Sequence, residues 1–127
     1  MLFRTLLFIP GNNERFVKKS LNLDPDILCY DLEDSVPLNE KVAARNLVKT
    51  YCKQVEVKSV ASVFVRINSI DSGLVRADLS GVIHMGLDGI VLPKINDAHE
   101  VGEVIQIIQE LEEERKLRPG RIALIPS

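Results

Sequence analysis

The sequence predicts an α/β fold in which parallel strands alternate with helices. Short apolar runs of strand length alternate with longer stretches whose apolar residues recur every three or four positions, and one more apolar run follows the last of these. The runs lack the polar alternation of half-solvated strands, which is typical of parallel strands buried on both faces. Two architectures fit: a doubly wound open sheet, and the first half of a TIM-type βα barrel.

Five segments are the expected strands. Each is short and apolar, and each ends near a turn residue or a polar residue. They cover residues 5–9, 27–32, 62–67, 89–92 and 122–125.

Four helices are expected between these strands. In the first, Asn12 is the expected N-cap and Phe16 lies on the buried side. The third is expected to stop at Gly86. Asp97 and Glu100 resemble a capping box at the start of the fourth.

Length and charge indicate one globular domain over residues 1–127 and exclude several partners. Sixteen basic and eighteen acidic residues leave a net charge of -2, so no nucleic-acid partner is expected. No apolar run reaches the roughly 20 residues that span a bilayer, so no membrane partner is expected. Cys29 and Cys52 form no metal motif and no disulfide framework, and cytoplasm is therefore the expected location. Dinucleotide and P-loop nucleotide motifs are absent from the sequence.

Polar and turn residues follow four of the expected strands. In either architecture the carboxyl ends of the strands meet on one side of the sheet, where ligands bind. The sequence therefore predicts one shared rim. Its members are Pro10, Gly11, Asn12, Asp31, Glu33, Asp34, Arg66, Asn68, Pro93 and Lys94.

An acidic cluster follows the second strand. Glu33 and Asp34 come just after Asp31, and carboxylates grouped in this way suit Mg²⁺, bound directly or through its waters. Acids at the start of a loop also serve in helix capping and in ordinary solvation. This segment alone leaves both interpretations open.

Arg66 is the sharper candidate because it ends a buried strand, where an unpaired guanidinium is costly. Its fork of donors suits a carboxylate or the oxygen of a developing enolate. The alternative is a structural ion pair with Asp31 or Glu33. Lys94 adds a second positive charge to the rim or is a solvated loop lysine.

Five segments of the chain carry a family resemblance. They read RTLLFIPGN at 4–12, DLEDSVP at 31–37, VRIN at 65–68, DGIVLPK at 88–94 and IALI at 122–125. In order and spacing they resemble the citrate lyase β-subunit group of the HpcH/HpaI aldolase superfamily.

The resemblance implies a βα barrel, Mg²⁺ dependence, and carbon–carbon lyase chemistry on a CoA- or carrier-bound 3-hydroxyacyl thioester. Citryl, malyl and citramalyl thioesters are substrates in this family, and some members add thioesterase activity. The resemblance implies that Arg66 is catalytic and binds substrate, and that Glu33 and Asp34 lie near the metal or its waters. It also implies a substrate-binding rim that includes Gly11, Asn68, Pro93 and Lys94.

The family's direct metal ligands follow its fifth and sixth strands, so we expect them beyond Ser127. The chain is then the amino-terminal half of a longer single-domain enzyme, inactive in isolation, or it completes itself as a homo-oligomer. A non-catalytic half-barrel that serves in assembly is the alternative. A receiver-like signalling domain ranks last. Such a domain carries its acids after the first strand and its lysine after the fifth, whereas here the acids follow the second strand and the lysine the fourth.

Overall fold

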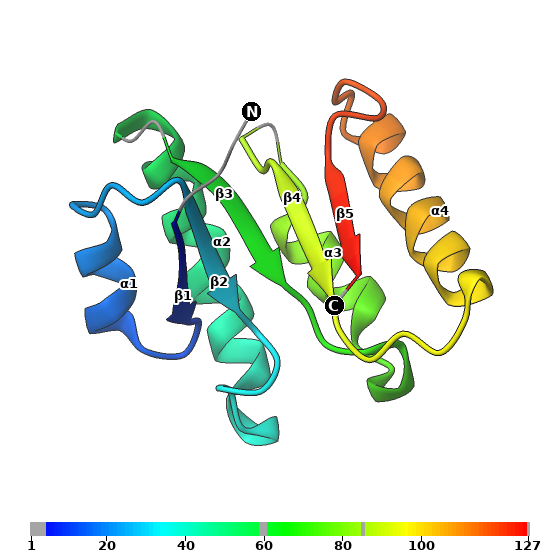
Figure 1. The fold of residues 1–127 in the computed structure, drawn as a ribbon, viewed down its shortest axis with the longest axis horizontal. Helices are drawn as coiled ribbons and strands as arrows, with labels where there is room; N and C mark the ends of the chain where they lie inside the picture. The colour runs from blue at the N-terminus through cyan, green and yellow to red at the C-terminus, as the bar shows by residue number, and fades with distance from the viewer. Residues whose placement is uncertain (1–4, 59–60, 85, 127) are drawn as a thin grey trace.

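The computed structural model describes residues 5–58, 61–84 and 86–126. Five strands form one parallel sheet (Figure 1). The strands are β1 (Leu6–Pro10), β2 (Ile27–Asp31), β3 (Ser62–Arg66), β4 (Gly89–Leu92) and β5 (Ala123–Pro126). The helices are α1 (Glu14–Ser20), α2 (Lys41–Lys58), α3 (Val75–Val82) and α4 (Ala98–Glu114), with the 3₁₀ turns η1 (Leu38–Glu40) and η2 (Ile70–Ser72).

The order of the strands decides between the two predicted architectures. The sheet runs β1-β2-β3-β4-β5, every pair is parallel, and each strand neighbours the next one along the chain. A doubly wound sheet reverses its order at a switch point, whereas a βα barrel does not. Right-handed crossovers then place the helices on one face: in Figure 1, α2 and α3 lie behind the sheet, and α1 and α4 flank its two edges. The half-barrel prediction is confirmed, and the doubly wound alternative is wrong.

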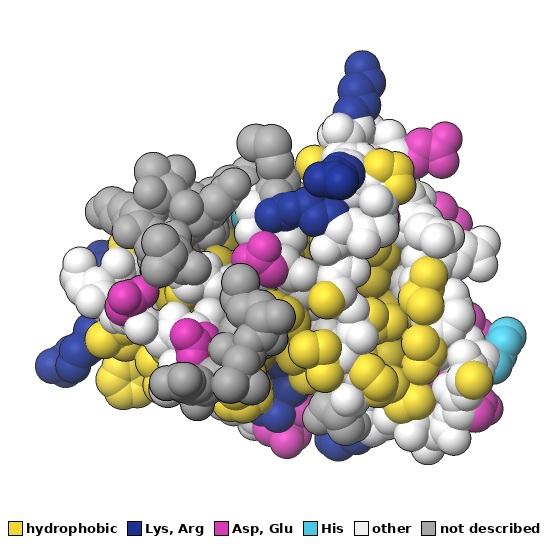
Figure 2. All heavy atoms as spheres, turned by 45° about the horizontal axis from the view of Figure 1, so that its top comes forward, with side chains coloured by type: hydrophobic (Ala, Val, Ile, Leu, Met, Phe, Trp, Pro, Cys, Tyr) yellow, Lys and Arg dark blue, Asp and Glu magenta, His cyan; other side chains and the backbone are white. Residues whose placement is uncertain are grey.

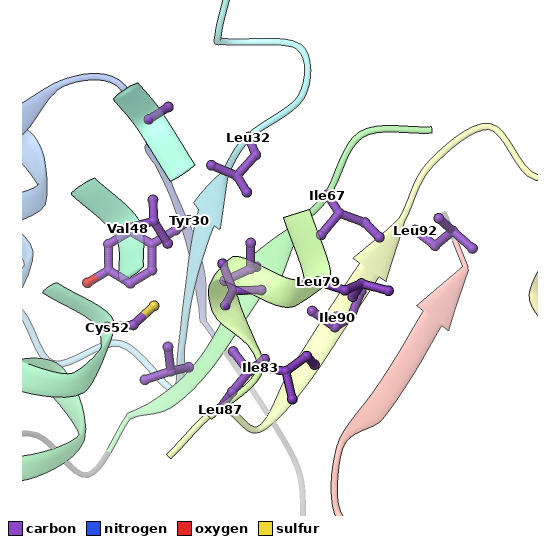
Figure 3. Packing of buried hydrophobic residues seen from close by; sticks show 14 of the residues in the cluster. Tyr30, Leu32, Val48, Cys52, Ile67, Leu79, Ile83, Leu87, Ile90 and Leu92 are labelled. Atoms are coloured by element: carbon purple, nitrogen blue, oxygen red, sulfur yellow. The ribbon is translucent and has the colours of Figure 1, made fainter. Parts of the chain in front are cut away.

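The helix-facing side of the sheet carries the main core. Apolar side chains from β2, β3 and β4 meet those of α2 and α3 in one cluster (Figure 3). Tyr30 is fully buried there, and its hydroxyl lies 2.7 Å from Ser20 Oγ, so the cluster includes a satisfied polar pair. This packing holds the strands in register and thereby sets the spacing of their carboxyl ends.

The opposite, concave face carries a smaller apolar cluster. Ile27, Cys29, Phe64 and Val91 are buried on it, whereas Phe8 of β1 is 45% exposed. A half-barrel is expected to leave its first and fifth strands as open edges, and β1 and β5 do lie at the edges of the sheet with mostly exposed side chains. Figure 2 shows hydrophobic side chains gathered on the side of the molecule where β4 and β5 lie. None of the described helices combines the length and apolar content needed to cross a membrane.

Helix α1 begins one residue later than predicted. Asn13, not Asn12, is the N-cap, and its Oδ1 accepts the backbone N–H of Phe16 at 3.1 Å. Phe16, Val17 and Leu21 are expected on one side of this helix; Val17 is buried and Leu21 packs against the core, whereas Phe16 is exposed. Adjacent residues point about a quarter of a helical turn apart, so Phe16 and Val17 do not face the core equally.

The predicted end of α3 is wrong, and the predicted start of α4 is confirmed. Helix α3 ends at Val82, and Ile83 is already extended, so Gly86 is not its stop. Asp97 caps α4 as predicted: its Oδ1 accepts the N–H of Glu100 at 3.1 Å. Glu100 in return accepts the backbone N–H of the residue before the cap.

Gly89 provides a test of the concave face. A Cβ at this position would overlap the ring of Phe64 on the neighbouring strand. We expect Gly89→Ala to lower the free energy of unfolding by about 2 kcal/mol in urea denaturation, because the packed ring must move. Gly102→Ala, in α4 with nothing within 4 Å of the new methyl group, should raise it slightly. Unchanged stability of Gly89→Ala would contradict the packing.

Candidate functional site

A buried ion pair joins the carboxyl ends of β2 and β3. Asp31 and Arg66 are partners in the register of the two strands. Arg66 donates from Nε to Asp31 Oδ1 and from Nη2 to Oδ2, both at 2.8 Å. Asp31 is only 2% exposed. The structural ion pair considered for Arg66 is therefore present, and it directs the guanidinium along the rim.

Asp31 also builds the turn that carries the acidic pair. Its Oδ1 accepts the N–H of Glu33 at 2.9 Å, and its Oδ2 accepts the N–H of Ser35 at 3.0 Å. The hydroxyl of Ser35 donates to the same Oδ2 at 2.7 Å. Both oxygens of Asp31 are occupied by protein donors, so it organises the site and is not itself the open carboxylate.

The charges of this pair support each other. Burial acts to raise the pKa of Asp31, but hydrogen bonds from Arg66, Ser35 and the Glu33 N–H outweigh it and hold the pKa at about 2. The hydrogen bond to Asp31 raises the pKa of Arg66 in turn, despite partial burial of the guanidinium. Both groups stay charged over the physiological range.

Glu33, Asp34 and Lys94 complete the charged rim. Glu33 is 7% exposed, with Oε1 3.8 Å from Arg66 Nε and Oε2 2.9 Å from Lys94 Nζ. Asp34 is open to solvent, with Oδ1 3.7 Å from the same Lys94 Nζ. The hydrogen bond to Glu33, followed by the charges of Glu33 and Asp34, raises the pKa of Lys94. The predicted acids and both predicted cations therefore lie together.

Lys94 adopts an uncommon backbone conformation. Its φ of 54° lies in the left-handed region, which costs a residue with a Cβ about 1 kcal/mol. It follows the buried Pro93 at the end of β4. Residues with a strained backbone are often found at functional sites. Here the ammonium group of Lys94 extends across the rim to Glu33.

One donor of Arg66 remains available at this rim. The ring of Phe8 lies 5.0 Å from the guanidinium carbon, and Asp31 takes Nε and Nη2. Among the described residues, Nη1 has no hydrogen-bond partner, and the side chain is 22% exposed. The arginine is thus pre-oriented, with a donor free for an oxygen of a ligand.

Asn68 and Gly11 occupy the rim for structural reasons. Asn68 is 3% exposed and donates from its backbone N–H and its Nδ2 to Asp78 Oδ2, at 2.9 and 2.7 Å. Gly11 donates its N–H to Asp31 O at 2.8 Å, and a Cβ there would lie 2.5 Å from that oxygen. Both residues stand where they were predicted, but their contacts in the structure are with the protein.

Asp78 is a site-supporting residue that the sequence analysis missed. It lies on α3, is 1% exposed, and accepts Arg45 Nε at 3.0 Å in addition to its bonds with Asn68. A signal was available, because Asp78 occupies a core-facing position between the buried Val75 and Val82 of α3. A carboxylate at such a position needs partners, and these tie α2 and α3 to the loop after Arg66.

A hollow of about 340 Å³ opens beside the charged rim. It lies between the loops that follow β2 and β3 and the start of the loop after β4. Its polar lining includes Glu33, Asp34, Lys41, Asn68, Ser69 and Lys94. A small polar ligand has room here beside Glu33, which also lies next to Arg66.

The carboxylates fit part of a magnesium site. Among the described residues there is no group of three side chains able to hold a metal ion together. Mg²⁺, however, keeps several waters and commonly uses only one or two carboxylates. Glu33 and Asp34 fit that role as acceptors for metal-bound water, because both carboxylates face the same point on the rim, which the 65% exposed ammonium side chain of Lys94 occupies here.

Comparisons with known proteins agree with this fold. Residues 4–126 match the HpcH/HpaI aldolase/citrate lyase family. The chain is 37% identical over 113 residues to citrate lyase subunit beta of Leuconostoc mesenteroides, and 36% identical over 109 residues to a (3S)-malyl-CoA thioesterase of Cereibacter sphaeroides. The crystal structure of CitE from Mycobacterium tuberculosis, in complex with magnesium and pyruvate, superimposes with a TM-score of 0.58 at 25% identity.

The matches cover most of this chain but less than half of each relative. They take in 89% and 86% of the chain, and 37% and 38% of the two curated relatives. For CitE the shares are 94% of this chain and 43% of that one.

Acid stability tests the role of Asp31. The pKa of this carboxyl group falls from 3.8 to about 2 on folding. The ionised group therefore stabilises the folded protein above pH 3.8, and this stabilisation is lost as the pH falls through about 2. Between pH 5 and pH 2 the wild type should lose about 2 kcal/mol more unfolding free energy than Asp31→Asn does. Urea denaturation across this range measures the difference, and equal acid dependence would contradict the ion pair.

Proposed function

Because the chain belongs to the HpcH/HpaI aldolase/citrate lyase family, we propose that the natural protein is a Mg²⁺-dependent carbon–carbon lyase. Its substrate would be a CoA- or carrier-bound 3-hydroxyacyl thioester of the citryl, malyl or citramalyl type. The names of the relatives and the magnesium and pyruvate of CitE support this assignment. The observation that carries it is the Arg66 guanidinium, held by Asp31 beside Glu33 at the ends of the strands.

Arg66 is the proposed catalytic residue. Cleavage of the bond next to the hydroxyl-bearing carbon leaves negative charge on the thioester oxygen as an enolate. Nη1 of Arg66 would donate to that oxygen, while Asp31 keeps Nε and Nη2 and so prevents reorientation. A donor oriented in advance in this way contributes about 3 kcal/mol to the stabilisation of a transition state.

Glu33 and Asp34 are the residues proposed to hold Mg²⁺ through its waters. When bound, the ion supplies a Lewis acid for the hydroxyl and carboxylate oxygens of the acyl group. Lys94 would balance the charge of both carboxylates in the absence of the ion, since its Nζ lies between them at 2.9 and 3.7 Å. Its long exposed side chain would then swing toward solvent or toward an anionic substrate.

A thioesterase is the second candidate, favoured by the 36% identity to a (3S)-malyl-CoA thioesterase. The same arginine would serve hydrolysis, because attack on a thioester also places charge on its oxygen. Assays of malyl-, citramalyl- and citryl-CoA separate the candidates: a lyase releases a keto acid or aldehyde and an acyl thioester, whereas a thioesterase releases the free thiol. Absence of turnover together with tight self-association would favour the non-catalytic assembly subunit.

Arg66→Lys tests the catalytic role. Lysine keeps the charge but offers no planar fork, so it cannot hold Asp31 at two points and also donate to a substrate oxygen. In the full-length natural protein we expect kcat/KM to fall by about 100-fold. Arg76→Lys is the matched control, because Arg76 is an exposed residue of α3 whose ion pair among the described residues is with Glu110, and the activity of this variant should match the wild type. Activity of Arg66→Lys within three-fold of the wild type would remove Arg66 from the mechanism.

Glu33→Gln tests the metal role. Loss of one carboxylate charge should raise the Mg²⁺ concentration for half-maximal activation about ten-fold. Glu103→Gln, on the outer side of α4 beside His99, should leave that concentration unchanged. If the two variants gave the same Mg²⁺ titration, Glu33 would have only a structural role.

A further inference from the structure

Lys41 joins a 3₁₀ turn to a helix. It follows η1 directly and is the first residue of α2, and Glu40 of η1 supplies an acidic residue at this junction. The Lys41 side chain does not extend freely into solvent but is partly buried against the end of β2. Its ammonium group is therefore directed back to the loop that follows β2.

The contacts of Lys41 show what it holds. Its Nζ donates to the backbone oxygen of Leu32 at 2.9 Å and to that of Glu33 at 2.8 Å. The oxygen of Glu33 also accepts the N–H of Val36 at 3.1 Å, which closes the turn. One ammonium group therefore fixes two consecutive peptide planes on either side of the Glu33 side chain.

Asp31 and Lys41 bind complementary backbone groups of the same turn. Asp31 accepts the N–H groups of Glu33 and Ser35, and Lys41 donates to the oxygens of Leu32 and Glu33. Both the donors and the acceptors of the turn are thus held by charged side chains, whose hydrogen bonds are stronger than neutral ones. Loss of Lys41 removes the charged donor from both oxygens and leaves the two peptide planes held only by the weaker Val36 N–H bond and by Asp31.

We propose that Lys41 is a positioning residue, which orients Glu33 and Asp34 for a hydrated divalent cation at the rim. The proposal rests on the proposed function for the identity of that cation. It goes beyond the proposed function by assigning the geometry of the acidic pair to Lys41, whose ammonium group bonds to the backbone oxygens of the turn and not to the two carboxylates. Groups that orient the ligands of a metal commonly change its affinity by 10- to 100-fold.

The first arm of the test does not depend on any activity. Amide hydrogen exchange of the full-length natural protein, without metal, reports the closure of the turn at the Val36 N–H. Lys41→Met should raise the exchange rate of this amide at least ten-fold, because the oxygen that accepts it becomes mobile. Lys41→Arg, which keeps the charge and two donors, should restore protection.

The second arm measures Mg²⁺ affinity by calorimetric titration of the same proteins. Lys41→Met should weaken binding about ten-fold, and Lys41→Arg should recover most of the affinity. Val82→Ala is a control for a general loss of stability. Val82 is buried on α3, so the substitution opens a cavity there, away from the helix that carries Lys41 and from the acidic turn. Its Mg²⁺ affinity should equal that of the wild type.

The outcomes separate the two proposals. If Val36 exchange is unchanged in Lys41→Met, or if Val82→Ala weakens Mg²⁺ binding as much as Lys41→Met does, the positioning role is wrong. If the wild type binds no Mg²⁺, the metal role in the proposed function is wrong, and hydrogen exchange alone decides whether Lys41 holds the turn. Should Lys41→Met fail to fold, Lys41→Gln, which retains one uncharged donor, should show intermediate exchange; exchange equal to the wild type would overturn the proposal.

Discussion

The bidentate pair of Asp31 and Arg66 is the interaction on which the rest of the rim depends. Each charge is placed where it is costly without the other, and breaking such a buried pair typically costs about 3–5 kcal/mol. The pair does more than neutralise charge. Through Asp31 it extends to the turn that presents Glu33, and through Arg66 it fixes the direction of the remaining donor. Strand register and the geometry of the charged groups are therefore set by the same contact.

The helix layer supports this rim through side chains that reach back to the loops. Lys41 holds the turn after β2, and Arg45, one helical turn further along α2, holds Asp78 and thereby the loop after β3. Gly81 makes this second brace possible, since a Cβ there would lie 2.8 Å from the Arg45 side chain. The spacing of the two loops is consequently fixed by one face of α2.

Much of the fold could be predicted because its pattern is local. The apolar runs of β2, β3 and β4 and the capping pair Asp97–Glu100 depend on neighbours within a few residues. The errors lie where local patterns are ambiguous. Asn12 and Asn13 are equally good caps in sequence, and of the adjacent apolar residues Phe16 and Val17 the structure buries Val17 and exposes Phe16. Gly86 is typical of a helix stop, but α3 ends at Val82.

The sequence by itself determined the alternation of strands and helices, the family, and the presence of acids, an arginine and a lysine at strand ends. Only the tertiary structure decided that the strands lie in chain order, that Arg66 is committed to Asp31, and that Asn68 is taken up by Asp78. The physical reason is that a buried charge must find its partners. Asp31 lies 35 residues from Arg66 along the chain, and Asp78 lies 10 residues from Asn68. Side chains so far apart in sequence meet because the sheet and its helices pack together.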